Sequence, residues 1–157
     1  AAQDERTAAG RGPRRSRYAD TGYPQVRGPW AATRRALAAM AAAAPAGQPV
    51  ALRYVNPKTG APPLATMGCE CQWLRPGEVT PASRSTASAV YHVIEGRGES
   101  RIGDAVLAWE PGDTFVAPSW HVVAHTNLAP SAPACLFQFN DEPVLRSLGL
   151  WQEERLP

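Results

Sequence analysis

Hydrophobic positions follow two different periods along the chain, and the change falls near residue 50. Before it, five side chains recur at spacings of three and four, as on one face of an α-helix: Trp30, Thr33, Leu37, Met40 and Ala44. Pro29 suits the start of such a helix, while Pro45 and Gly47 end it. The pattern predicts one helix whose single apolar stripe is buried against another surface.

After residue 50 the apolar positions alternate, which is the period of a β-strand. Turn signals such as Asn56-Pro57 and Glu110-Pro111-Gly112-Asp113 separate the alternating stretches. Eight strands are expected, over residues 50–55, 67–74, 90–94, 99–102, 106–109, 114–117, 121–126 and 135–139. A short terminal helix over 144–148, capped by Asp141, completes the set. The pattern predicts an all-β jelly roll or small barrel.

These periods divide the chain into three parts. Residues 1–28 are rich in Arg, Gly and Pro without periodicity and are expected to form a flexible arm. Residues 29–48 form the linker helix, and 49–157 form the barrel with its terminal helix. The chain starts at Ala1 rather than Met, so we expect a processed or excised N-terminus.

Charge and composition exclude several classes of function. Residues 1–60 hold ten Lys and Arg against three Asp and Glu, although the whole chain carries only +2. The basic arm has no aromatic stacking platform, so we expect no nucleic-acid binding. No apolar run reaches about 18 residues, so no membrane span is expected. The three cysteines, Cys69, Cys71 and Cys135, are expected to be free thiols, and the protein cytoplasmic.

Two segments have the spacing of the two cupin motifs. In the first, Gly77 and Gly96 bracket Ser83, Ser85 and Ala89, where that motif places His-x-His and Glu. In the second, Val123 stands five residues after Pro118 and four before Asn127, where the motif places His. Ligands two apart on a strand share its inward face, and three imidazoles with open positions suit Fe(II). Ser83, Ser85, Ala89 and Val123 lack those ligands, so no metal is expected here.

The remaining histidines allow two interpretations. His121 and His125 flank Val123 at a spacing of two and should face the lumen if the strand is regular, whereas His92 should point outward. A rebuilt metal site could use His121 and His125 with Tyr91, Cys69 or Cys71. The interpretation we favour has two pocket histidines held by hydrogen bonds, because two ligands on one strand seldom hold a metal. Tyr91 then fills the lumen or bonds to His125.

Taken together, five segments resemble gentisate 1,2-dioxygenase and the related salicylate and 1-hydroxy-2-naphthoate dioxygenases. They are residues 53–60 (RYVNPKTG), 74–78 (LRPGE), 90–98 (VYHVIEGRG), 109–113 (WEPGD) and 118–120 (PSW). Trp120 stands where most cupins have Gly, and this family has Trp there. The similarity extends over residues 29–155.

The resemblance implies a bicupin oligomer that opens hydroxylated aromatic rings, with Fe(II) held by three histidines in its N-terminal cupin. This chain is similar to the C-terminal cupin. Its expected partners are therefore further copies of the same chain, in a homo-oligomer, and an upstream catalytic cupin domain. We expect a catalytically silent half of such an enzyme.

Two alternatives remain. One is a free-standing dioxygenase rebuilt around His121 and His125. The other is a metal-free cupin binding an aromatic acid in a lumen of Ser83, Ser85, Tyr91, His121, Val123 and His125.

Overall fold

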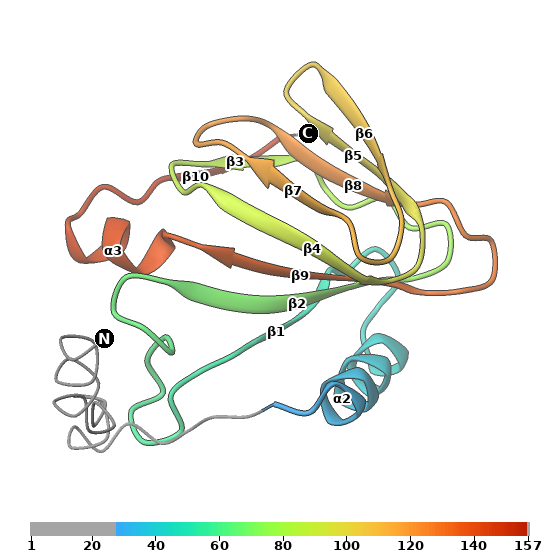
Figure 1. The fold of residues 1–157 in the computed structure, drawn as a ribbon, viewed down its shortest axis with the longest axis horizontal. Helices are drawn as coiled ribbons and strands as arrows, with labels where there is room; N and C mark the ends of the chain where they lie inside the picture. The colour runs from blue at the N-terminus through green and yellow to red at the C-terminus, as the bar shows by residue number, and fades with distance from the viewer. Residues whose placement is uncertain (1–27, 157) are drawn as a thin grey trace, which may run out of the picture.

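The computed structural model describes residues 28–156, which form two antiparallel sheets of five strands facing each other (Figure 1). The predicted arm, apart from Gly28, lies outside the described residues. Sheet A has the order β1 (Val50–Arg53), β2 (Gly68–Leu74), β9 (Ala134–Asn140), β4 (Ala89–Glu95) and β7 (Thr114–Ala117). Sheet B has the order β10 (Glu153–Arg155), β3 (Ser83–Ser85), β8 (Val123–Asn127), β5 (Gly98–Ile102) and β6 (Ala105–Trp109). This is the predicted all-β cupin jelly roll.

Two short strands were not predicted from the sequence. In β3 and β10 the residues are Ser-Arg-Ser and Glu-Glu-Arg, and neither has an apolar alternation. They pair with each other at the edge of sheet B, where Arg84 and Glu154 form an ion pair at 2.6 Å. Backbone pairing and this ion pair hold them in place, so a search for buried apolar positions does not find them.

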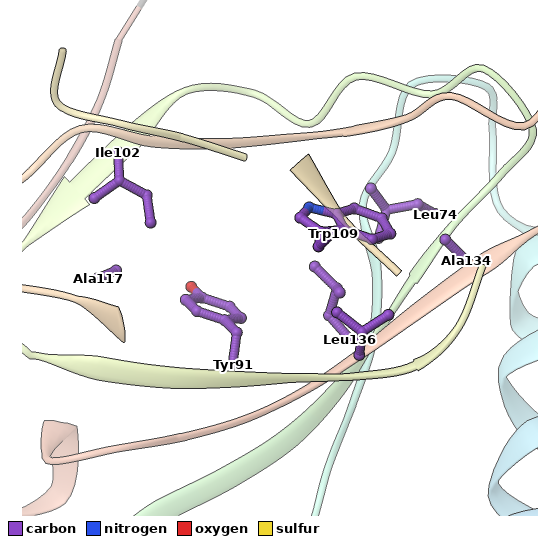
Figure 2. Close-up of a cluster of buried hydrophobic side chains, with 8 residues drawn as sticks. Leu74, Tyr91, Ile102, Trp109, Ala117, Ala134 and Leu136 are labelled. Atoms are coloured by element: carbon purple, nitrogen blue, oxygen red, sulfur yellow. The ribbon is translucent and has the colours of Figure 1, made fainter. Parts of the chain in front are cut away.

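The main core fills the space between the two sheets. Figure 2 shows Tyr91 and Leu136 reaching up from sheet A, with Ile102 and Trp109 reaching across from sheet B. Leu136 and Val93 are fully buried, and Trp109 is 4% exposed. The aromatic and branched side chains therefore fill one end of the lumen and leave room at the other.

Helix α2 (Trp30–Ala43) covers the outer face of sheet A, on the side away from the lumen (Figure 1). Thr33 and Leu37 are buried there, as expected, and the partly buried Ala38 and Ala41 pack beside them. Met40 was predicted on the same stripe, but it is 42% exposed. Ala41 faces the sheet instead of Met40, because it lies one turn after Leu37. The small methyl group of Ala41 lets the helix approach the sheet closely.

Arg75, in the turn after β2, holds the end of α2. Its Nη2 donates to the carbonyl oxygens of Ala41 at 3.1 Å and Ala44 at 3.3 Å. These carbonyls belong to the last helical turn, which lacks partners within the helix itself. The linker helix is therefore fixed to the barrel by charge-assisted bonds as well as by apolar packing.

The terminal helix α3 (Glu142–Ser147) starts two residues earlier than predicted. Asp141 precedes it but makes no side-chain cap, because its Oδ1 accepts instead from the backbone N–H of Ser88 at 2.8 Å. Asn140 caps the helix in its place, since its Oδ1 accepts from the backbone N–H of Glu142 at 3.2 Å. In the part of the chain that the structure describes, no helix is long and apolar enough to cross a membrane.

Candidate functional site

The four motif positions meet at one cavity of about 400 Å³ between the sheets. Ser83 and Ser85 reach it from β3, Ala89 from β4 and Val123 from β8. Ser83 and Val123 are direct cross-strand partners, which is the facing-strand arrangement that the spacing predicts. The local geometry of a cupin ligand site is therefore present.

The chemistry of a metal site is not present at these positions. Two hydroxyls, a methyl and an isopropyl group replace the imidazoles and carboxylate that would hold an Fe(II)-type ion. Across residues 28–156, no group of three or more His, Cys, Asp or Glu side chains could hold a metal ion. The residues that line this cavity do not fit the family's iron.

His121 does not lie on the strand where the sequence pattern placed it. Strand β8 begins only at Val123, so the predicted strand start at residue 121 is wrong, although His121 still lines the cavity with Val123 and His125. His121 is exposed at the rim of the cavity, and its Nδ1 lies 3.1 Å from the carbonyl oxygen of Ser119. The turn after Pro118 breaks the strand, and His125 alone of the pair is buried.

The thiols offered as further ligands point away from the cavity. Cys71 is fully buried with Cys135 and Trp73 in a second cluster beneath α2, on the outer face of sheet A. A hydrogen bond from Cys135 lowers the pKa of Cys71 to about 7. Cys69 lines a different pocket beside Tyr54, and burial raises the pKa of its thiol. A site combining either thiol with His125 is therefore not formed.

His92 points outward, as its parity predicted. It is exposed, and its Nδ1 lies 3.0 Å from Oγ1 of Thr114 on the neighbouring strand β7. His92 does not line the cavity.

His125 belongs to a buried chain of three polar groups that the sequence analysis missed. Its Nδ1 lies 2.6 Å from Oγ of Ser100, its direct cross-strand partner on β5. Trp109 on β6 donates from Nε1 to the same oxygen at 2.9 Å. Burial lowers the pKa of His125 to about 4, so the imidazole is neutral at neutral pH. No linear motif joins these residues, because only strand pairing brings them together.

Tyr91 fills the lumen, as expected, but it makes no hydrogen bond to His125. The two rings meet edge to face with centroids 4.7 Å apart, and Tyr91 stacks on Phe115 at 5.2 Å. Figure 2 shows the Tyr91 hydroxyl pointing from β4 into the space between the sheets. An aromatic wall of Tyr91 and His125 therefore borders the cavity, with Phe115 stacked on Tyr91.

One row of cross-strand partners runs across the whole of sheet A to this wall. It is Arg53, Glu70, Gln138, Tyr91 and Phe115, one residue from each strand. Gln138 donates from Nε2 to Oε1 of Glu70, whose Oε2 accepts from Nε of Arg53 at 3.2 Å. The sequence analysis missed the polar members. The signal was the alternation Cys-Glu-Cys-Gln-Trp in β2, where α2 covers the Cys and Trp face and leaves Glu70 to the lumen.

Comparison with known proteins gives several relatives, although no family model matches the chain. It is 40% identical over 135 residues to 5-aminosalicylate 1,2-dioxygenase of Comamonas sp, covering 84% of this chain and 36% of that protein. It is 36% identical over 133 residues to gentisate 1,2-dioxygenase of Ralstonia sp, covering 85% of this chain and 38% of that one. The chain thus spans little more than a third of the curated relatives it matches.

Solved structures agree with this relationship. Salicylate 1,2-dioxygenase from Pseudoaminobacter salicylatoxidans superposes with a TM-score of 0.75 at 30% identity, over 82% of this chain and 36% of that one. The Cnp3 cupin domain of Schizosaccharomyces pombe matches in fold alone, with a TM-score of 0.53 at 10% identity. Sequence and fold together show that the chain is a cupin domain of the gentisate 1,2-dioxygenase family.

Proposed function

We propose that this domain is the catalytically silent C-terminal cupin of an aromatic-ring-cleaving dioxygenase. In this proposal the catalytic Fe(II) belongs to a separate, N-terminal cupin, and the present domain supports packing and assembly of the oligomer. The proposal depends on one observation: Ser83, Ser85, Ala89 and Val123 converge on one cavity and offer no ligand for iron. The length of the relatives supports it, because they have room for a second domain of similar size.

Metal analysis of the purified chain tests this function. After loading with Fe(II) and dialysis, the wild-type chain is expected to retain no stoichiometric metal. The variant S83H/S85H/A89E/V123H restores three imidazoles and a carboxylate at the converging positions and is expected to gain about one ion per chain. S83A/S85A is the matched control that changes the same strand without adding ligands. Stoichiometric iron in the wild-type chain would contradict the proposal.

The assembly role needs a separate measurement. Light scattering of the full chain is expected to give the mass of a homo-oligomer, and co-expression with an upstream cupin should give a complex. A chain that stays monomeric and does not associate with such a cupin would remove the assembly role.

A second candidate function is that of a free-standing, metal-free cupin that binds a small ligand. It is favoured by the cavity itself, since Tyr91 and His125 line it and, within residues 28–156, neither the Tyr91 hydroxyl nor Nε2 of His125 has a hydrogen-bond partner. A dioxygenase rebuilt around His121 and His125 has less support, because no third ligand accompanies them among the described residues. Oxygen uptake with gentisate or salicylate after Fe(II) loading separates that alternative from both others.

A further inference from the structure

Two polar groups at the inner end of the cavity have no partner within the described protein. Tyr91 is 8% exposed and His125 is 3% exposed, yet neither the tyrosine hydroxyl nor Nε2 of the histidine makes a hydrogen bond. No fully buried polar side-chain atom of residues 28–156 lacks a partner, so these two atoms must touch the cavity. The two atoms are therefore open to water or to a ligand from the cavity, although the residues that carry them are more than nine-tenths buried.

The hydrogen-bond pattern around Ser100 fixes which proton His125 presents. Trp109 can only donate, so Oγ of Ser100 accepts from it, and the Ser100 hydroxyl proton needs an acceptor. Nδ1 of His125, at 2.6 Å, is the acceptor available within this fully buried group. Nδ1 is therefore unprotonated, and the neutral ring carries its proton on Nε2. The inner end of the cavity thus presents two donors, Tyr91 O–H and His125 Nε2–H.

The charges near these donors select against an anion. Glu70 lies in the same cross-strand row as Tyr91 and contributes to raising the pKa of its hydroxyl, after burial. The guanidinium of Arg53 is engaged by Glu70 at 3.2 Å, and His125 is neutral. A carboxylate beside the two donors would lose its hydration and face the charge of Glu70, whereas the other arginines that line the cavity, Arg84 and Arg155, enter it from β3 and β10.

Part of the wall around these donors is apolar. The ring of Tyr91, itself stacked on Phe115, stands on one side, and Ala89, Ala117 and Val123 line the space beside it. Gln138, next to Tyr91 in the row, uses its amide nitrogen on Glu70, which leaves its carbonyl oxygen as an acceptor. We propose that the cavity binds a small uncharged phenol, whose oxygen accepts from Tyr91 and His125 and whose own proton goes to Gln138.

This inference rests on the metal-free lumen of the proposed function and goes beyond it. It assigns the domain a ligand site of its own and makes Ser100 and Trp109 positioning residues, since they act on the ligand only through His125. It also differs from the aromatic acid named in one of the two alternatives raised from the sequence, because the inner end favours a hydroxyl over a carboxylate.

Titration of the isotopically labelled full chain with phenol and with benzoate tests the site. The two probes have rings of the same size and differ in charge. With the chain free of metal at neutral pH, phenol is expected to shift the resonances of Tyr91, His125 and Ser100. Benzoate should bind at least about tenfold more weakly, because its charge is not compensated at the inner end.

Three variants test whether the hydrogen bonds of the two donors, rather than general packing, determine phenol binding. Y91F removes one hydrogen bond and should weaken phenol binding roughly fivefold, and T114A, which removes a hydroxyl outside the cavity, should not change it. In S100A the imidazole should become a mixture of tautomers, which long-range proton–nitrogen spectra of His125 report directly. If Ser100 only packed in the core and did not orient the His125 proton, the spectrum of S100A would match that of the wild type.

Three results would overturn the inference: no phenol binding by the folded, metal-free wild type, equal affinity for benzoate, or unchanged affinity in folded Y91F. The proposed function fails by a different result, namely stoichiometric iron in the wild-type chain. The two can therefore be told apart in one preparation, whose metal content is measured before the titration.

Discussion

Trp120 has a backbone φ of 63°, the one positive value among the described residues other than glycine. A Cβ is crowded in this conformation, so glycine is the residue that adopts it at the lowest cost. The indole is 41% exposed and stacks under the guanidinium of Arg84 at 4.8 Å. The strain is thus held at the rim of the cavity, next to the chain segment that carries His121.

The variants W120G and W120A isolate that strain. Both lose the stack with Arg84, but only the alanine keeps a Cβ in the left-handed conformation. We expect W120G to be more stable than W120A by about 1 kcal/mol in urea unfolding. The opposite order, which applies at ordinary φ values, would show that the turn has relaxed.

His125 should make stability depend on pH. Its pKa is about 4 when folded and near 6.5 when unfolded, so between these values only the unfolded chain takes up the proton. Stability is therefore complete above about pH 6.5 and falls as the pH drops toward 4, by at most about 3 kcal/mol. Urea unfolding across this range checks the slope. H125Q should have a shallower slope than the wild type, and equal slopes would assign the effect to carboxylates instead.

At the scale of elements, the position of α2 depends on one face of the helix. Leu37 is fully buried against sheet A, whereas Met40 on the same helix is 42% exposed. L37A should cost about 2–5 kcal/mol of unfolding free energy by leaving a cavity, and M40A less than about 0.5 kcal/mol. Equal losses in the two variants would mean that α2 is rotated from the position described.

The strands that carry apolar alternation could be predicted from the sequence, and so could the convergence of Ser83, Ser85, Ala89 and Val123. That convergence followed from the spacing of the two cupin motifs, because local alternation sets which face a side chain takes but not which strands meet. β3 and β10 could not be predicted, because their stability comes from pairing with each other. The Ser100–His125 contact was missed for a similar reason, since it depends on the register between β5 and β8.

At the scale of the whole molecule, the second cluster beneath α2 protects two thiols from reagents. Cys71 has a pKa of about 7, which by itself would make it reactive, but Cys71 and Cys135 are fully buried. A thiol reagent should therefore label at most Cys69 in the native chain and all three cysteines in denaturant. Mass spectrometry of the labelled peptides reads this out. Fast labelling of Cys71 in native buffer would show that α2 leaves the sheet.

Gly98 contributes no functional group, yet the polar chain at His125 depends on it. A Cβ there would meet the carbonyl oxygen of Thr126 at 2.0 Å and the ring of Trp109 at 2.5 Å. The indole of Trp109 can reach Ser100 only because residue 98 has no side chain. A single added methyl group would therefore displace the indole or the strand pairing that holds Ser100 beside His125, from a position that does not itself line the cavity between the sheets.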